Sequence, residues 1–332
     1  MTARAPALSS ASRKARLVGA FLRGDPVHCT WQLSPRCESF CHFCEHRAEA
    51  GAEEIDAAAC AAVAAELGRS ASLLVSFTGS EPFLRDDLAA VVAAVAARHF
   101  PLLVTNGWLV TAARARAAWE AGLEAVTVTI EDGLAEAHDA LAGVPGSHAR
   151  ALRAVECLAA ARTRRGQRVN VRTRLRGSDL GPLERVLALP LPREATVTLE
   201  PAFPLPLLDG EAGAVVARLR ELRRRHPRLR VAGPALDGVV RALTGGVSGC
   251  LAGRAFFNVD HRGRVTKCVE FRRPVDEAGT LPAAGAERVR ARLRAAHAAN
   301  DCRACWYASR AEIESLYTVR GFLAGLRTLV TA

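Results

Sequence analysis

The sequence predicts an α/β protein with a parallel sheet and helices packed on its outside. Six short β-rich runs alternate with longer helical patterns between about residues 27 and 201, as repeated βα units do. Several of the helical patterns begin at an Asp, Thr or Ser, which are residues that cap helix N-termini. Loops after the strands hold the active site in such folds, so residues at strand ends are the functional candidates.

The expected elements follow one another in a regular order. Strands are predicted at 27–33, 73–78, 102–105, 125–130, 169–175 and 196–200. Helices are predicted at 56–67, 86–98, 111–121, 147–162 and 183–189. Beyond these units we expect a helix at 211–225, a Gly/Pro-rich connection, a hairpin of strands 256–260 and 265–269, and a helix at 286–298.

Composition and charge indicate which binding partners and which cellular compartment to expect. The 332-residue chain has a net charge of +11, which invites a nucleic-acid or acidic-carrier hypothesis. Its arginines are scattered over helical faces without an aromatic-interleaved basic stripe, so nucleic acid is the less favoured partner. No run approaches the roughly 20 apolar residues of a membrane span, and no signal peptide is recognisable. We expect a cytoplasmic protein, whose reducing surroundings keep ten cysteines as thiols.

Three cysteines, Cys37, Cys41 and Cys44, lie in one short predicted loop after the first strand. Their thiolates suit three corners of an iron–sulfur cube and leave its fourth iron without a protein ligand. The spacing alone does not decide between this site and two alternatives. These are a disulfide pair with one thiol left over, and a zinc knuckle completed by His28, His42 or His46.

A second run, 78–82 with the sequence Thr-Gly-Ser-Glu-Pro, follows one βα unit after the triplet. Together with the three cysteines and Phe43, it resembles the radical S-adenosylmethionine (SAM) superfamily. In that family a Gly-Gly-Glu-Pro element ends the second strand and hydrogen-bonds the methionine amino group of SAM. Ser80 replaces the second Gly here, which would be costly if that position needed a positive φ. We expect the replacement to be tolerated.

The resemblance implies a partial (β/α)6 TIM-like barrel, with a SAM-binding [4Fe-4S] cluster on Cys37, Cys41 and Cys44. It also makes polar residues at four strand ends candidates for SAM contacts. An ordinary strand-end role competes for Thr129 and Glu131, and is slightly favoured for Arg172 and Arg174. The candidate cofactor-binding residues are Phe43, Thr78, Gly79, Ser80, Glu81, Pro82, Asn106, Thr129, Glu131 and Arg174.

Four more cysteines, Cys250, Cys268, Cys302 and Cys305, accompany the predicted hairpin and end in a C-x-x-C. A hairpin, a helix and a C-x-x-C also build many zinc ribbons, which would be the first choice for this segment alone. Beside the first motif, the arrangement resembles the Twitch domain, the short form of the SPASM extension. That resemblance implies a small C-terminal iron–sulfur domain whose four cysteines bind one auxiliary [4Fe-4S] cluster.

The resemblance implies an enzyme that reductively cleaves SAM to a 5′-deoxyadenosyl radical, which takes a hydrogen atom from a substrate. A low-potential, flavodoxin- or ferredoxin-like donor would supply the electron. A cluster saturated by four thiolates favours a net oxidation of a small molecule or a peptide, although no substrate or catalytic residue is identifiable. The alternative is a non-catalytic zinc- or nucleic-acid-binding metalloprotein. We expect an extension at 1–25, the barrel core at 26–205, a helical completion and linker at 206–249, the auxiliary domain at 250–308 and a helical tail at 309–332.

Overall fold

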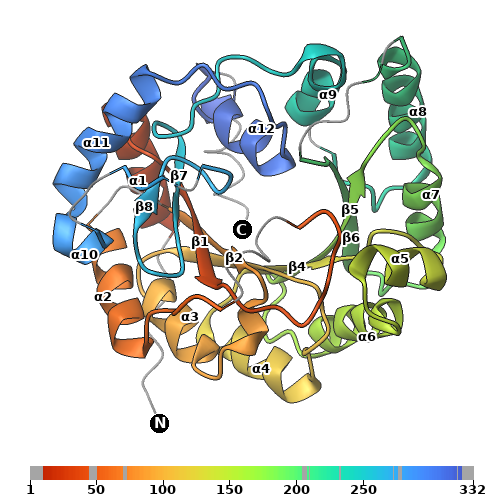
Figure 1. Cartoon of the computed structure of the whole chain (residues 1–332), viewed down its shortest axis with the longest axis horizontal. Helices are drawn as coiled ribbons and strands as arrows, with labels where there is room; N and C mark the ends of the chain where they lie inside the picture. The colour runs from red at the N-terminus through yellow and green to blue at the C-terminus, as the bar shows by residue number, and fades with distance from the viewer. Residues whose placement is uncertain are drawn as a thin grey trace.

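The computed structural model describes residues 10–44, 51–69, 73–203, 208, 210–231, 233–271, 273–275, 279–319 and 321–323. A curved sheet lies inside a ring of helices (Figure 1). The strands are β1 (His28–Ser34), β2 (Leu74–Gly79), β3 (Phe100–Thr105), β4 (Ala125–Thr129), β5 (Arg168–Leu175), β6 (Ala195–Pro201), β7 (Phe256–Val259) and β8 (Val265–Thr266). All six predicted βα units are therefore present.

The described helices lie mostly outside the sheet (Figure 1). They are α1 (Ser10–Arg23), α2 (Ala57–Leu67), η2 (Pro82–Leu84), α3 (Leu88–Ala96), α4 (Ala112–Ala121), α5 (Ala135–Ala142), α6 (Ser147–Ala160), α7 (Gly181–Ala188), α8 (Ala212–Arg225), α9 (Gly233–Gly245), α10 (Leu281–Ala284), α11 (Ala286–Ala298) and α12 (Ala308–Ser315). Among the described residues, none of the helices is long and apolar enough to cross a membrane.

The eight strands form one sheet in the order β6-β5-β4-β3-β2-β1-β7-β8. Neighbouring strands are parallel except β7 and β8, which form the predicted hairpin. The hairpin continues the main sheet, because Cys29 of β1 is in register with Phe257 of β7. The sheet does not close, and α9 and α12 lie between its two ends (Figure 1). The predicted α/β class and partial barrel are confirmed.

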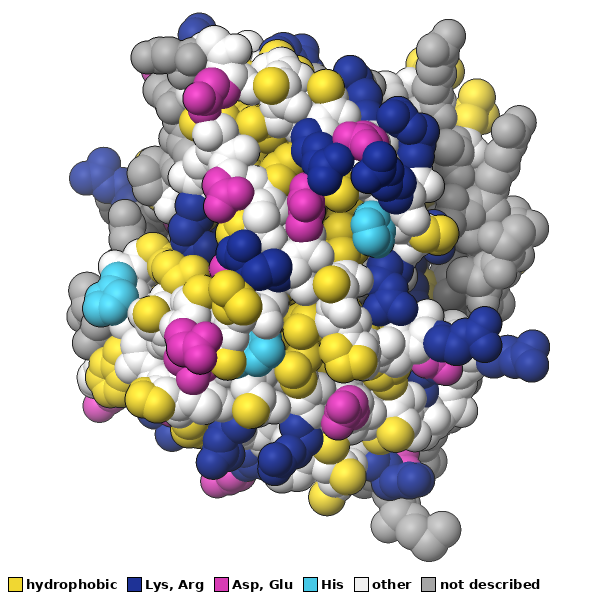
Figure 2. Space-filling view, turned by 90° about the vertical axis from the view of Figure 1, so that its right-hand side faces the viewer, with side chains coloured by type: hydrophobic (Ala, Val, Ile, Leu, Met, Phe, Trp, Pro, Cys, Tyr) yellow, Lys and Arg dark blue, Asp and Glu magenta, His cyan; other side chains and the backbone are white. Residues whose placement is uncertain are grey.

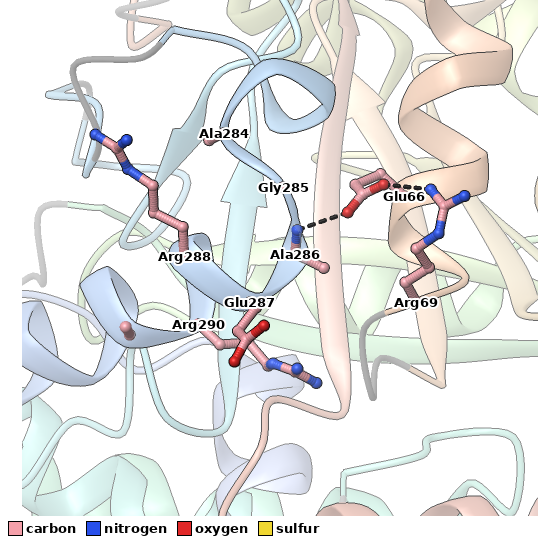
Figure 3. A pocket seen from close by; sticks show the side chains of 9 residues that line it. Glu66, Arg69, Ala284, Gly285, Ala286, Glu287, Arg288 and Arg290 are labelled. Atoms are coloured by element: carbon pink, nitrogen blue, oxygen red, sulfur yellow. Dashed lines mark hydrogen bonds and ion pairs between the residues drawn. The ribbon is translucent and has the colours of Figure 1, made fainter.

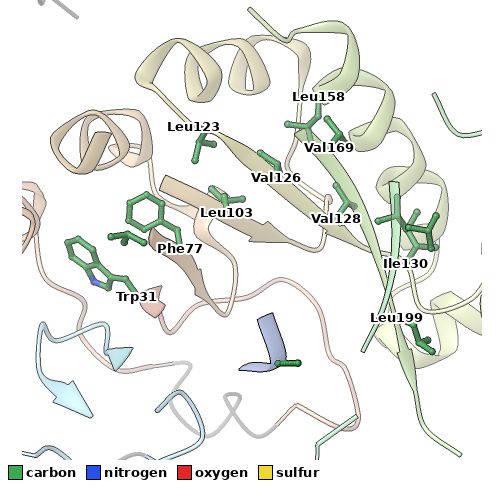
Figure 4. Close-up of a cluster of buried hydrophobic side chains, with 14 of the residues drawn as sticks. Trp31, Phe77, Leu103, Leu123, Val126, Val128, Ile130, Leu158, Val169 and Leu199 are labelled. Carbon is green, nitrogen blue, oxygen red and sulfur yellow. The ribbon is translucent and has the colours of Figure 1, made fainter. Parts of the chain in front are cut away.

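Alternation along each strand divides the sheet into an apolar face and a polar face. Trp31, Phe77, Leu103, Val126 and Val169 are buried on the face that packs against the helices (Figure 4). The rings of Trp31 and Phe77 lie 5.8 Å apart between centroids. Removal of these side chains from water stabilises the barrel by roughly 1.5–3 kcal/mol for each large apolar group. The opposite positions face the inside of the barrel.

Four helices depart from the sequence prediction. The sequence does not predict α1, α5, α9 or α10, whereas α12 lies almost entirely within the segment expected to form a helical tail. Gly233 and Pro234 indicate a loop when read as isolated residues, but a proline is well accommodated in the first turn of a helix and α9 begins there. The expected Gly/Pro-rich connection before Cys250 is therefore largely helical. The second hairpin strand is also shorter than predicted, ending at Thr266.

Candidate functional site

The turn after β2 is hydrogen-bonded to the chain immediately before the cysteine loop. The backbone N–H of Ser80 donates to Ser34 O at 2.9 Å, and its hydroxyl donates to Pro35 O at 2.9 Å. The N–H of Glu81 donates to Arg36 O at 2.9 Å. The two sequence motifs are thus joined by three hydrogen bonds to the residues that lead into Cys37.

Gly79, and not Ser80, is the residue of this turn that needs glycine. Gly79 has a φ of +114°, whereas no described residue other than glycine has a positive φ. A Cβ on Gly79 would lie 2.7 Å from Ser34 O. Ser80 therefore takes the place of the family's second Gly without backbone strain, as expected.

Glu81 is fully buried and ties the ends of β2 and β3 together. Its carboxylate accepts hydrogen bonds from Phe83 N at 2.9 Å, from the Thr105 hydroxyl at 2.8 Å and from Asn106 N at 2.8 Å. Burial, with the nearby charge of Glu38, raises the pKa of Glu81 to about 7. The side chain is thus engaged by protein groups, so its first role is to fix the turn.

The three cysteines of the loop are half-buried, and the N–H of Cys44 donates to Cys41 O at 3.1 Å. Burial raises the pKa of the Cys37 thiol to about 12 and that of Cys41 to about 11, and neighbouring thiols add to both shifts. A thiol with a raised pKa stays protonated in the metal-free protein and releases its proton when it binds a metal. Three soft donors in one loop fit an iron–sulfur cluster.

All ten cysteines are free thiols. The described residues contain no group of three His, Cys, Asp or Glu side chains already placed for a metal ion, which applies to the iron–sulfur and the zinc interpretations alike. His28 is buried with Nε2 2.8 Å from Ser76 Oγ, and His42 is exposed. His46 lies outside the described residues.

Phe43 is contacted by two guanidinium groups that share one carboxylate. The guanidinium carbons of Arg174 and Arg176 lie 4.1 Å and 4.4 Å from the centre of the Phe43 ring. Nε of Arg174 donates to Glu131 at 2.7 Å, and Arg176 donates to the same carboxylate at 2.9 Å. Burial alone would raise the pKa of Glu131, but the two arginines lower it below its ordinary value. This group connects the ends of β4 and β5 to the cysteine loop.

Thr129 belongs to a second polar connection inside the barrel. Arg172 donates to the Thr129 hydroxyl at 2.9 Å and to Glu200 at 3.2 Å, which joins β4, β5 and β6. These two contacts are typical of a structural residue, the role that the sequence slightly favours for Arg172 and that stays a prediction. Sequence reasoning missed Arg176, which follows the predicted strand directly and could have been noticed as the third arginine of an alternating set.

The remaining candidates border the same loop. Thr78 is half-buried near the end of β2, and Pro82 is buried in the first turn of η2. The Asn106 side-chain amide donates to Ser39 Oγ at 3.2 Å and to Cys37 Sγ at 3.7 Å. The structure therefore brings all the predicted strand-end residues to one rim of the barrel.

The C-terminal cysteines are gathered from separate segments. Burial raises the pKa of the Cys268 thiol to about 11 and that of the Cys305 thiol to about 12. The nearby Cys250 sulfur raises both pKa values further. Arg310 is buried and donates to Cys305 O at 2.6 Å and to Val247 O at 3.2 Å. A fixed cation beside buried thiols favours their ionised form, which is the form that binds iron or zinc.

Asn300 connects Cys302 to the other segments of this site. Its amide donates to Cys250 O at 2.8 Å, and its carbonyl oxygen accepts from Lys267 Nζ at 2.8 Å and from Cys302 N at 3.4 Å. The Tyr307 hydroxyl also donates to Glu270, which joins the C-x-x-C segment to the one that follows Cys268. Spacing patterns gave no signal for these residues, because their partners are distant in sequence.

Two open pockets lie beside these sites. One, of about 650 Å³, is lined by residues 51–55 and Arg262, where the chain after the cysteine loop meets the hairpin turn. The other, of about 660 Å³, lies between α2 and α11 on the outside of the barrel (Figure 3). Glu66 accepts from Ala286 N there and is paired with Arg69 (Figure 3). The Glu66 carboxylate therefore already accepts a hydrogen bond from the first residue of α11.

The side of the molecule that carries α5, α7 and α8 mixes charges of both signs. Figure 2 shows basic side chains there interspersed with acidic and hydrophobic ones. On this face the described basic residues form no continuous stripe.

Comparison with known proteins identifies the barrel. A family model described as "Radical SAM superfamily" matches residues 31–187, which include both motifs. Residues 31–187 are thus similar to radical SAM domains, which agrees with the resemblance found in the sequence. The C-terminal cysteines lie outside the matched residues.

Curated relatives are similar over part of the chain. A PqqA peptide cyclase from Methylocella silvestris is 34% identical over 38% of this chain and 35% of its own length. A pre-heme d1 synthase from Dinoroseobacter shibae is 31% identical over 50% and 41%, and the mycofactocin maturase MftC from Mycobacterium tuberculosis is 31% identical over 44% and 38%. The chain thus spans about two fifths or less of the length of these relatives.

Solved structures agree on the fold. Streptococcus suis SuiB superimposes with a TM-score of 0.58 at 14% identity, over 77% of this chain and 64% of that chain. The structure of anSMEcpe with bound AdoMet and a peptide gives a TM-score of 0.58 at 15% identity, over 80% of each chain. These likenesses extend past the matched family region and support one architecture for most of the chain.

Proposed function

We propose that the protein is a radical SAM enzyme whose cluster is held by Cys37, Cys41 and Cys44 and whose fourth iron binds SAM. When bound, the cluster supplies the electron that cleaves SAM into methionine and a 5′-deoxyadenosyl radical, which takes a hydrogen atom from the substrate. The protein's part is to orient SAM, to hold the substrate and to exclude water. The observation that carries the proposal is the triple hydrogen-bonded contact between the turn after β2 and residues 34–36.

The rim of the barrel supports specific roles for its residues. The turn of Gly79, Ser80 and Glu81 would receive the methionine amino group. The guanidinium nitrogen Nη2 of Arg176 is buried and has no hydrogen-bond partner among the described residues. It would therefore donate to the SAM carboxylate. Arg174 and Glu131 would orient that guanidinium, and Phe43 would shield the cluster from water. Thr78, Pro82, Asn106 and Thr129 complete the proposed cofactor-binding set.

We infer a second, auxiliary [4Fe-4S] cluster on Cys250, Cys268, Cys302 and Cys305 in a Twitch/SPASM-like domain. The convergence of these segments through Asn300 and Arg310 supports it. Four thiolates saturate a cube, so this cluster suits electron transfer better than substrate coordination. That arrangement favours a net oxidation, in which hydrogen abstraction removes one electron and the auxiliary cluster accepts the second.

The substrate is a peptide or a small polar natural product. Relatives named as a peptide cyclase and a maturase favour modification of a peptide or of a compound made from one. A low-potential, flavodoxin- or ferredoxin-like protein in the reducing cytoplasm would deliver the electron. The competing function, a zinc-binding protein without catalysis, is favoured only by the likeness of the C-terminal segment to a zinc ribbon.

The test is reductive SAM cleavage by anaerobically reconstituted protein. The wild type should form 5′-deoxyadenosine with dithionite, as measured by chromatography. A variant with Cys37, Cys41 and Cys44 replaced by Ala should form none, whereas Cys157→Ala, in a half-buried helical position, should behave as wild type. Equal 5′-deoxyadenosine from the triple variant and the wild type would contradict the proposed function.

A further inference from the structure

Asn106, a predicted SAM-binding residue at the end of β3, also contacts the cysteine loop. Its side-chain amide lies 3.7 Å from Cys37 Sγ and 3.2 Å from Ser39 Oγ. Its carbonyl oxygen accepts from Trp108 N at 2.9 Å, and its own N–H donates to Glu81 at 2.8 Å. The bond to Glu81 fixes the backbone of Asn106, and the bond from Trp108 fixes its side chain. The side-chain amide is therefore already oriented toward Cys37.

Cys37 is distinguished from the other two cysteines by its hydrogen bonds. It accepts from the Asn106 amide and also from Ser39 N at 3.4 Å. The Cys41 sulfur is instead influenced by the charges of Arg174 and Glu131 and by its own backbone N–H. Hydrogen bonds to cluster sulfurs stabilise the more negative, reduced state, and so raise the reduction potential.

We propose that Asn106 is a positioning residue that fixes Cys37 and raises the reduction potential of the SAM-cleaving cluster. This inference rests on the proposed function, because it requires a cluster on the loop. It assigns to the Thr-Asn-Gly end of β3 a role directed at the cluster sulfur. The donor would then reduce the cluster more easily before SAM binds.

Two substitutions separate the amide from the rest of the residue. Asn106→Asp keeps an oxygen that can accept from Trp108 N, removes the N–H donor and adds a negative charge near the cluster. Asn106→Leu removes the donor without a charge. Asn170→Asp is the matched control, because Asn170 lies on β5 and bonds Thr196 Oγ1 at 2.5 Å instead of a cysteine.

The measurement is a redox titration of the full, reconstituted protein, followed by electron paramagnetic resonance of the signal that changes when SAM is added. Asn106→Leu should lower the reduction equilibrium constant roughly tenfold, about 59 mV for one electron. Asn106→Asp should lower it further, and Asn170→Asp should leave it unchanged. Iron content should stay equal in all four proteins.

The outcomes distinguish the two levels of the argument. A wild-type protein without any SAM-responsive iron–sulfur signal would remove the proposed function and this inference with it. A wild-type signal whose potential is the same in Asn106→Asp and Asn106→Leu would overturn the role of Asn106 and leave the proposed function in place. A shift of equal size in Asn170→Asp would also overturn it, since the effect would then be one of general charge.

Discussion

The three cysteines after β1 lie within one short loop, whereas the four C-terminal cysteines are gathered between Cys250 and Cys305. Backbone hydrogen bonds with the neighbouring turn support the first site. The second depends on side chains, chiefly Asn300 and Arg310. From this difference we expect the proposed first site to need only the pairing of β1 and β2, and the proposed second site to need the complete C-terminal segment.

The largest effect should come from the buried cation of the second site. Arg310→Met removes the hydrogen bonds to Cys305 O and Val247 O and the ion pair with Glu314, whose atoms lie 2.8 Å apart. Loss of one member of such a buried set costs roughly 3 kcal/mol or more. The variant should therefore lose about half of its iron, measured after reconstitution, while still cleaving SAM.

Arg303 supplies the control for this change. It lies in the same segment, but its side chain is exposed, so Arg303→Met should keep the wild-type iron content. A full iron complement in Arg310→Met would show that the second site does not depend on this residue. Loss of SAM cleavage together with the iron would show that the two sites are not independent.

A comparable effect at the first site should follow from one methyl group. Gly79→Ala places a Cβ 2.7 Å from Ser34 O at a φ of +114°, which costs roughly 1–3 kcal/mol in backbone conformation and further energy in the clash. We expect a lower melting temperature and little SAM cleavage. Ser80→Gly, its matched control, loses only the hydrogen bond to Pro35 O, about 1 kcal/mol. Equal effects of the two variants would contradict the assignment of the turn.

Acid should weaken the barrel through two buried histidines. Burial lowers the pKa of His28 and of His138 from 6.5 to about 4, so both are neutral in the folded protein at pH 5, while the unfolded chain binds the protons. Their stabilisation is complete above pH 6.5 and is lost as the pH falls toward 4. Each histidine should contribute a fall of roughly 2 kcal/mol in the free energy of unfolding, measured in urea, between pH 7 and pH 5. The raised pKa of Glu81 opposes this fall, because the folded protein takes up that proton before the unfolded chain does.

Replacement of one histidine tests this attribution. His28→Gln cannot take up a proton in either state, so it should lose roughly 2 kcal/mol less stability than the wild type between pH 7 and pH 5 while keeping a partner for Ser76. If its stability falls with pH as steeply as that of the wild type, the acid response lies elsewhere in the molecule.

The sequence predicted the barrel well because its signals are local. Alternation in β1 to β6 and Asp or Thr caps such as Asp56 and Thr111 define the βα units, and the structure shows both caps bonded to their helices. The pairing of β7 with β1 was beyond such reasoning, since the paired residues lie more than 200 positions apart. Short alanine-rich helices such as α5 also lack a periodic apolar face strong enough to predict.

The candidate site divides along the same line. The cysteine loop and the turn after β2 are fixed by spacing and could be predicted. The ion pairs that join Arg174 and Arg176 to Glu131 depend on the register between neighbouring strands, and Asn300 acts between segments far apart in the chain. These tertiary contacts explain why Arg176 and Asn300 were not among the predicted site residues.

The measurement that tests the account most directly is the content of iron, sulfide and zinc in anaerobically reconstituted protein. The account predicts roughly eight iron and eight sulfide per chain, the content of two cubes. It predicts about four of each when Cys37, Cys41 and Cys44 are replaced by Ala, and about four when Cys302 and Cys305 are replaced. About four iron with one zinc, unchanged by replacement of the three loop cysteines, would contradict the assignment of a SAM-cleaving cluster to that loop.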